Sequence, residues 1–397
     1  MILQHQPPLH LTYCLNIHPG ESWQENLAAI REKAARVKQF VSPDGWFGLG
    51  LRISSQAAGE LSADGALREE ALAVFAEHGL YPFSVNAFPF GKFHGGPVKE
   101  NVYAPDWRSP ARRDYTMLVA DILAGWLPDA VDGSISTVPG SFKDWIRTGD
   151  DTTAMALNLG ILAAYLAALR EDTGREIHLG IEPEPSCFLE TTGETVAFFR
   201  DHVWTTSAGH VARIRGCGAS EAGEIVRRHI GVCLDTCHVA LQFEDPLESL
   251  RAYRAQGIRI SKVQLSAALM TGGGEECWNA LLPFAEGVYL HQVKARTAGG
   301  EIRSWTDLPV ALADNDGRND IKEVRVHFHV PLFFQGNGPL ASTASTLTPE
   351  FFRELRNGVT SHVEIETYTF DVLPEAIRPP DVVRSISREF EWVGEQL

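Results

Sequence analysis

The chain has 397 residues and a formal net charge of −16, because 51 acidic residues outnumber 35 basic ones. A surface this acidic repels the phosphates of nucleic acids and anionic membranes, which argues against both as partners. The six cysteines are scattered and a chain this long needs no disulfides, so we expect reduced thiols and a cytoplasmic protein. The first residues lack a signal-peptide pattern, and the apolar segment 154–169 predicts a buried helix that is too short to span a bilayer comfortably.

Short apolar segments alternate with amphipathic or apolar helical segments along the whole chain. The segments that predict strands are residues 11–17, 46–54, 82–88, 133–138, 177–182, 231–235, 260–265 and 362–367. This alternation is typical of parallel strands joined by crossover helices, whose strands are covered on both faces and therefore continuously apolar. Eight such units predict a single α/β domain over residues 1–397, folded as a (β/α)8 TIM barrel.

Two long insertions account for the remaining length. One spans about residues 88–114 and the other about residues 270–335, and both are rich in aromatic residues. Neither has the composition of a flexible linker, so we expect ordered loops at the C-terminal face of the barrel. Within the second insertion, residues 287–296 and 323–333 predict two paired strands.

Polar side chains gather where the predicted strands end, which is where barrels of this type place their active sites. Carboxylates crowded into one barrel mouth repel each other unless a cation lies between them. We therefore predict one divalent metal ion. Oxygen ligands favour Mn²⁺, Mg²⁺ or Co²⁺, and imidazole would favour Zn²⁺ or Mn²⁺. The predicted ligands are Glu182, Asp235, Gln264, Glu366 and His329.

Each of these residues has a simpler interpretation. In the segment GVCLDTCH, Asp235 is also a plausible helix cap and His238 a plausible core histidine. Glu184 and Glu364 share strand faces with Glu182 and Glu366, and each is an alternative to its neighbour. Substrate contacts are predicted for His238, His327, Asn86, His18, Arg52 and Lys92, although the two basic residues could instead form ion pairs.

Several motifs resemble those of the xylose-isomerase-like superfamily, which contains sugar isomerases, sugar epimerases and endonuclease IV. These motifs are LDTCH, GIEPEP, KVQLS, an H-x-H pair and VEIETY. A wider set resembles the EboE family, whose members belong to a bacterial metabolite-traffic gene cluster. That set consists of LTYCLNIHPGESW, VNAFPFGKFHG, GSISTVPGS, GIEPEPSCFLETT, KVQLS and VHFHVPLF.

The epimerase resemblance implies that Glu182 and Glu366 are both metal ligands and the catalytic acid and base. Gln264 would be a ligand where these epimerases usually have a histidine, and His238 would contact substrate hydroxyls. The implied reaction is isomerisation or epimerisation of a sugar, sugar phosphate or cyclitol. One glutamate would remove a proton beside a carbonyl, the metal would stabilise the enediolate, and the other glutamate would return the proton.

Two alternatives remain open. An endonuclease-IV-like phosphodiesterase would need further histidines at early strand ends, where this chain has Asn86 and Val138. A non-catalytic metabolite-binding or scaffold protein of the same pathway would keep the barrel mouth without the reaction. A small-molecule sugar or cyclitol is the expected partner, and a homodimer is left open.

Overall fold

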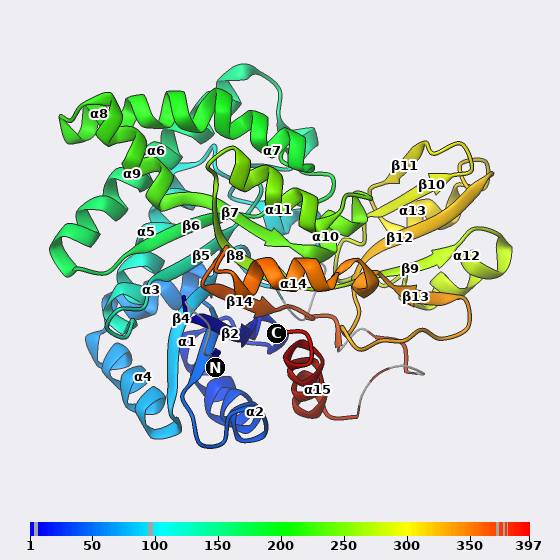
Figure 1. Cartoon of the computed structure of the whole chain (residues 1–397), viewed down its shortest axis with the longest axis horizontal. Coiled ribbons are helices and arrows are strands. Elements are labelled where there is room, and N and C mark those ends of the chain that lie inside the picture. The colour runs from blue at the N-terminus through cyan, green and yellow to red at the C-terminus, as the bar shows by residue number, and fades with distance from the viewer. Residues whose placement is uncertain (4–6, 94–97, 371–372, 376–377, 379) are drawn as a thin grey trace.

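The computed structural model describes residues 1–3, 7–93, 98–370, 373–375, 378 and 380–397 (Figure 1). Residues 94–97 belong to the first predicted insertion and lie outside the described residues. They include His94 and Gly95, the end of the motif VNAFPFGKFHG.

Eight parallel strands form a nearly closed barrel, which confirms the predicted TIM-barrel fold (Figure 1). An isolated parallel bridge between Cys14, directly after β2 (Leu9–Tyr13), and Gly50 of β3 (Phe47–Arg52) joins these two strands and nearly closes the barrel. The short antiparallel strand β1 (Ile2–Leu3) pairs beside β2. In chain order the barrel strands are β2 (Leu9–Tyr13), β3 (Phe47–Arg52), β4 (Leu80–Asn86), β5 (Gly133–Thr137), β6 (Ile177–Ile181), β7 (Ile230–Asp235), β8 (Arg259–Leu265) and β14 (His362–Ile365).

Each predicted strand overlaps one of these barrel strands, but the first prediction extends too far. The strand β2 ends at Tyr13, and residues 15–17 form a short 3-10 turn, η1 (Leu15–Ile17). Asn16 therefore points into the barrel mouth from a turn and not from a strand. Almost every barrel-strand residue is buried, as expected for strands covered on both faces.

The helices around the barrel connect its strands. The long helix α6 (Gly149–Thr173) contains the apolar segment 154–169. Among the described residues it is the one helix long and apolar enough to cross a membrane, but 56% of its most apolar window is buried in the fold. The others are α1 (Trp23–Ala29), α2 (Ala35–Val41), α3 (Ser55–Ala63), α4 (Gly65–His78), α5 (Pro110–Trp126), α7 (Thr192–Phe198), α8 (Ala208–Arg215), α9 (Ala219–His229), α10 (Thr236–Leu241), α11 (Pro246–Ala255), α14 (Pro349–Arg356) and α15 (Val382–Gly394).

The second insertion forms a sheet of its own beside the barrel (Figure 1). Strand β10 pairs antiparallel with β12, as the sequence pattern predicts. Two short helices, α12 (Glu275–Leu281) and α13 (Leu308–Ala313), complete the insertion. In order across the sheet the strands are β11 (Ile302–Trp305), β10 (Val293–Thr297), β12 (Ile321–His329), β9 (Ala268–Gly272) and β13 (Leu340–Ser342).

The two insertions contact each other above the barrel mouth. The first contains a 3-10 turn, η3 (Lys99–Tyr103), and the backbone N–H of Val98 donates to the carbonyl of Val288 at 2.8 Å. The ammonium of Lys99 donates to Asp307 at 2.7 Å and to the carbonyl of Tyr289 at 2.7 Å. These contacts place aromatic residues of both insertions over the barrel's C-terminal face.

Candidate active site at the barrel mouth

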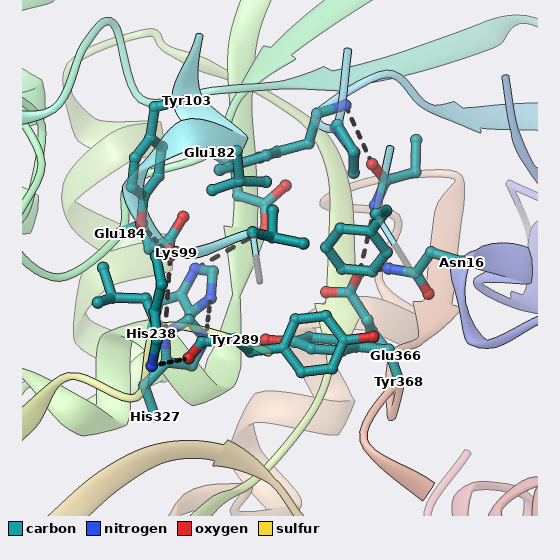
Figure 2. Close-up of a pocket in the computed structure, with 17 residues that line it drawn as sticks. Asn16, Lys99, Tyr103, Glu182, Glu184, His238, Tyr289, His327, Glu366 and Tyr368 are labelled. Carbon is teal, nitrogen blue, oxygen red and sulfur yellow. Dashed lines mark hydrogen bonds and ion pairs between the residues drawn. The ribbon is translucent and has the colours of Figure 1, made fainter. Parts of the chain in front are cut away.

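A pocket opens at the C-terminal ends of the barrel strands, beneath the two insertions (Figure 2). It contains about 540 Å³ of empty space, including solvent at its mouth. Its apolar lining includes Phe88, Phe93, Val98, Val102 and Leu290. Its polar lining consists of Asn16, Asn86, Tyr103, Glu182, Glu184, His238, His327 and Glu366.

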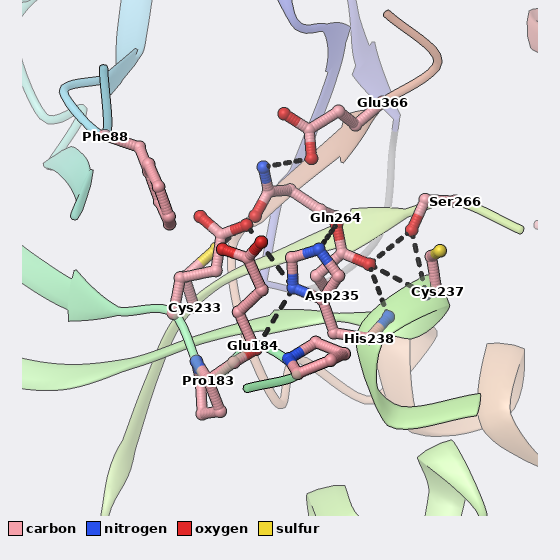
Figure 3. Close-up of polar contacts among 12 residues, drawn as sticks. Phe88, Pro183, Glu184, Cys233, Asp235, Cys237, His238, Gln264, Ser266 and Glu366 are labelled. Atoms are coloured by element: carbon pink, nitrogen blue, oxygen red, sulfur yellow. Dashed lines mark hydrogen bonds and ion pairs between the residues drawn. The ribbon is translucent and has the colours of Figure 1, made fainter. Parts of the chain in front are cut away.

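Asp235 ends β7 and caps α10, so the simpler interpretation of the GVCLDTCH segment holds for one of its oxygens (Figure 3). Its Oδ1 accepts hydrogen bonds from the backbone N–H of Cys237 at 2.7 Å and of His238 at 3.1 Å, and from Ser266 Oγ at 2.6 Å. Its Oδ2 is buried and has no hydrogen-bond donor among the described residues. The cap fixes the carboxylate and leaves one oxygen available for a ligand.

Three buried carboxylates converge beside this oxygen. One oxygen each from Glu182, Asp235 and Glu366 lies within 4.8 Å of the others, and all three residues are at most 4% exposed. The Oε2 of Glu182 also lacks a donor among the described residues. The structure thus brings together three of the predicted ligands, although their role as ligands stays a prediction.

Three side-chain amides hold Glu366 in place. Its Oε1 accepts from Asn16 Nδ2 at 2.8 Å and from Asn86 Nδ2 at 3.2 Å. Its Oε2 accepts from Gln264 Nε2 at 2.7 Å (Figure 3). Amide donors neutralise no charge, so they fix the position of the carboxylate without removing the repulsion from its neighbours.

Burial and mutual repulsion oppose ionisation of the two glutamates. Burial, followed by the charges of Glu366 and Asp235, raises the pKa of Glu182 well above its ordinary value. Burial, followed by Asp235, does the same to the pKa of Glu366. A divalent cation between the carboxylates would lower both pKa values again. The structure thus contains the crowding of carboxylates that was inferred from the strand ends.

The neighbouring glutamates have different partners. Glu364 lies deeper in the barrel, where Lys262 Nζ donates to its Oε2 at 2.5 Å. Glu184 accepts a hydrogen bond from Tyr103 Oη at 2.6 Å and a weaker one from Gln292 Nε2 at 3.4 Å. Glu182 and Glu366 are therefore the members of each pair that face the third carboxylate, Asp235.

Three buried histidines adjoin the carboxylates. His327 Nε2 lies 3.1 Å from His238 Nε2 and 3.3 Å from His329 Nε2. The Nδ1 atoms of His238 and His329 lie 3.0 Å and 2.8 Å from the backbone carbonyls of Pro183 and Glu366. Because a carbonyl oxygen only accepts, both of these Nδ1 atoms carry the proton.

The tautomer of His327 follows from Gln292. The Nε2 of Gln292 donates to the carbonyl of Pro185 at 3.0 Å, so its Oε1 is the atom 2.6 Å from His327 Nδ1. That Nδ1 also carries a proton. Burial lowers the pKa of His327 well below its ordinary value and that of His329 to about 4, so both rings are neutral near pH 7.

His327 Nε2 is thus within about 3.3 Å of the Nε2 atoms of both His238 and His329. Tetrahedral Zn²⁺ with Zn–N bonds of 2.0–2.1 Å would separate its nitrogen ligands by about 3.3 Å, which is close to the spacing here. One atom each of Asp235, His238 and His329 also lies within 4.8 Å of the others. The histidines can therefore hold a cation next to the carboxylates, and Asp235 belongs to both groups.

Four predicted site residues have other partners or lie away from the pocket, and their roles stay predictions. Gln264 directs its amide nitrogen at Glu366, and its Oε1 accepts from Cys233 Sγ at 2.5 Å, so its oxygen is not offered to the carboxylate group. The other three, His18, Arg52 and Lys92, are not among the residues that line the pocket.

Each of those three has a local reason for its position. Arg52 is buried and needs acceptors, which it finds in Glu21 at 2.7 Å and in the carbonyl of Gly91 at 3.1 Å. His18 Nε2 lies 2.9 Å from Tyr13 Oη. Lys92 is exposed on the first insertion.

Sequence reasoning did not identify the residues that the insertions contribute. Tyr103, Tyr289 and Lys99 line the pocket from the two insertions, and Tyr368 lines it from the segment after β14 (Figure 2). The aromatic content of both insertions was the available signal. It indicated ordered loops but did not single out positions, because contacts between loops far apart in sequence have no local pattern.

No family model and no curated protein matches the sequence. A xylose isomerase-like TIM-barrel protein from Mycobacterium smegmatis, in complex with magnesium, superposes with a TM-score of 0.51 at 10% identity, over 98% of this chain and 95% of that one. The IolI protein with a bound zinc atom gives a TM-score of 0.42 at 11% identity, over 98% and 99% of the chains.

A xylose isomerase domain-containing protein from Salmonella typhimurium gives a TM-score of 0.45 at 12% identity, over 97% and 96% of the chains. At such low identity these likenesses concern the fold alone. The match to the Mycobacterium smegmatis protein supports the TIM-barrel fold predicted from the alternating strands and helices.

Proposed function

We propose that this chain is a divalent-metal-dependent isomerase or epimerase of a sugar, sugar phosphate or cyclitol. The observation that carries the proposal is the group of three buried carboxylates, in which Glu182 and Glu366 both line the pocket. Two glutamates that reach one substrate from different strands can serve as the base and the acid of a proton transfer.

The donor set fits a divalent cation. Glu182 Oε2 and Asp235 Oδ2 are buried without donors among the described residues, and Glu366 carries the third carboxylate. Oxygen donors suit Mn²⁺, Mg²⁺ or Co²⁺, and the adjoining imidazoles of His238, His327 and His329 suit Zn²⁺ or Mn²⁺. When bound, the ion would polarise a substrate carbonyl and stabilise negative charge on its oxygen.

The protein's own groups would move the proton. Glu182, which lines the pocket, would remove a proton from the carbon beside the carbonyl. Glu366, held by three amides, would return it to the same or the neighbouring carbon. Phe93, Tyr289 and Tyr368 form one aromatic cluster over the pocket and would exclude water from the intermediate.

The family assignment and cellular role are part of the proposal. The EboE-like motifs support a place in a bacterial metabolite-traffic or secondary-metabolism pathway, in the cytoplasm. The zinc and magnesium in the two structural neighbours support a metal-dependent role for this chain.

The test combines metal analysis with isotope exchange. Purified protein would be stripped with a chelator, reloaded with Mn²⁺, Zn²⁺, Mg²⁺ or Co²⁺, and incubated in D₂O with keto- and aldo-sugars, their phosphates and inososes. We expect deuterium at the carbon beside the carbonyl only with metal present. Glu182→Gln and Glu366→Gln should each abolish exchange, while Glu389→Gln, a buried glutamate outside the pocket, should retain it.

Other outcomes would favour the alternatives. Exchange with none of the compounds, or full activity in both site variants, would contradict the proposal. Three zinc ions per chain together with hydrolysis of bis(p-nitrophenyl) phosphate would favour a phosphodiesterase. Tight sugar binding without exchange would favour a binding or scaffold protein.

A further inference from the structure

Unlike a phosphate-binding site, the pocket has little positive charge in its lining. Of the described residues that line it, Lys99 is the one with a permanent positive charge. Its ammonium already donates to Asp307 at 2.7 Å, to the carbonyl of Tyr289 at 2.7 Å and to that of Glu286 at 3.5 Å. Three acceptors use all three N–H groups, so Lys99 offers none to a ligand.

The other polar groups of the pocket are mainly acceptors. Glu182 Oε2 and Asn16 Oδ1 are buried without donors among the described residues. Glu184 and Glu366 are further buried carboxyl groups that line the pocket. A ligand that fits this set must bring hydrogen-bond donors. Hydroxyl groups do so, whereas a phosphate or carboxylate brings only further acceptors and negative charge.

The aromatic residues of the pocket favour a compact C–H surface. The rings of Phe93, Tyr289 and Tyr368 have centroids 5.2 to 5.6 Å apart and form one wall. A sugar or cyclitol ring has a hydroxyl rim and an apolar C–H face, so it can meet both kinds of lining at once. A phosphate extending from such a ring toward the insertions would meet this wall and the occupied Lys99.

We infer that the pocket takes an uncharged, unphosphorylated polyol, such as a free sugar or cyclitol, and discriminates against its phosphate esters. This inference rests on the proposed function for the site, but it concerns binding and not turnover. A cation at the carboxylates would engage the reacting oxygens of the ligand and would leave the remote end facing the aromatic wall.

The test compares matched ligands on the metal-loaded full chain by calorimetry. D-Fructose would be paired with D-fructose 6-phosphate, and myo-inositol with myo-inositol 1-phosphate. We expect the free polyol of at least one pair to bind at least about tenfold more tightly than its phosphate, corresponding to roughly 1.4 kcal/mol. Equal or tighter binding of the phosphates, or no binding of either free polyol, would overturn the inference.

A charge variant sharpens the test. Asp307→Asn keeps the hydrogen-bond acceptor that caps α13 but removes the carboxylate charge beside Lys99. It should strengthen binding of the phosphate esters severalfold and leave the free polyols unchanged. The matched control is Asp314→Asn, a carboxylate of the same insertion that accepts from Trp305 Nε1, and it should change neither. Equal effects of both variants on the phosphates would also contradict the inference.

The result separates this inference from the proposed function. Free polyols that bind without exchanging deuterium would refute the reaction but keep the ligand class. A phosphate ester that binds best and exchanges deuterium would refute the ligand class but keep the reaction.

Discussion

Two glutamates that lie two residues apart, Glu364 and Glu366, occupy contrasting environments. Glu364 lies inside the barrel, where Lys262 donates to it at 2.5 Å and Ser84 Oγ donates at 3.1 Å. Glu366 lies at the mouth, where amides hold it and other carboxylates crowd it. The inner layer is a closed ion pair that contributes to the fold. The outer layer crowds three carboxyl groups together, and a bound cation would favour their ionisation.

The packing of the inner layer leaves room for the ion pair between Lys262 and Glu364. A Cβ atom on Gly50 would lie 2.1 Å from Glu364 Oε1, so only glycine leaves room for the buried carboxylate. Among the described residues, the trio at the mouth has histidine neighbours but no lysine or arginine ion-pair partner. Removing a charge should therefore lower the stability of the inner layer and relieve repulsion in the outer layer.

The largest expected effect is in the inner layer. Lys262→Met would leave Glu364 buried without a cation, and the free energy of unfolding should fall by about 3–5 kcal/mol. Urea denaturation would measure the loss. The double variant Lys262→Met/Glu364→Gln should recover most of it, and Lys322→Met, at an exposed lysine, should have almost no effect. If Lys262→Met were as stable as the wild type, the contrast between the inner and outer layers would be wrong.

Glu389, a buried residue outside the barrel, avoids a buried negative charge in a third way, because its carboxyl group stays protonated. Burial raises the pKa of Glu389 to about 7, although Thr367 Oγ1 and the N–H of Leu332 both donate to it. The folded state therefore keeps a proton that the unfolded state releases, and stability falls as pH rises from about 4.5 to about 7.

Glu389→Gln removes this pH dependence. The difference in unfolding free energy between variant and wild type should move by about 3 kcal/mol in favour of the variant between pH 4 and pH 8. Denaturant titrations across that range would measure it, with Glu391→Gln, at an exposed position on the same helix, as the control. A difference that does not change with pH would show that Glu389 is ionised in the fold.

Glu366→Gln tests the outer layer. The sign of its effect on stability should depend on whether metal is bound. In chelator-treated protein the variant should be slightly more stable than the wild type, because one of three mutually repelling carboxylates is gone. With metal added, the order should reverse, since the wild type gains more binding energy. Thermal melts with and without metal would detect the reversal. Lower stability of the variant in both conditions would mean that the trio does not carry unbalanced charge.

The smallest effect is expected at Tyr103. Tyr103→Phe removes the hydroxyl that donates to Glu184 at 2.6 Å, and Gln292 remains as a weaker donor. The loss of stability should be about 1 kcal/mol, with metal content unchanged. A loss of metal in this variant would show that Glu184 belongs to the ion-binding group.

The strand pattern predicted the site only as far as local sequence could. Eight apolar segments identified the barrel, and the fold rule that strand ends form the active site placed Glu182, Asp235 and Glu366 in one mouth. The pattern could not find Lys262, which lies in the middle of the apolar strand β8, because its partner Glu364 is 102 residues away.

What the sequence determined by itself was the repeating period of buried strands and the residue types at their ends, since both follow from backbone geometry and solvent exclusion. The tertiary structure alone decided the partners of each polar group. It directed the amide of Gln264 at Glu366 and gave Arg52 two carbonyls and Glu21 as acceptors. It also placed the imidazoles of His238 and His329 against that of His327. Such pairings depend on strand register and on insertions meeting in space, and neither is encoded in the local spacing of residues.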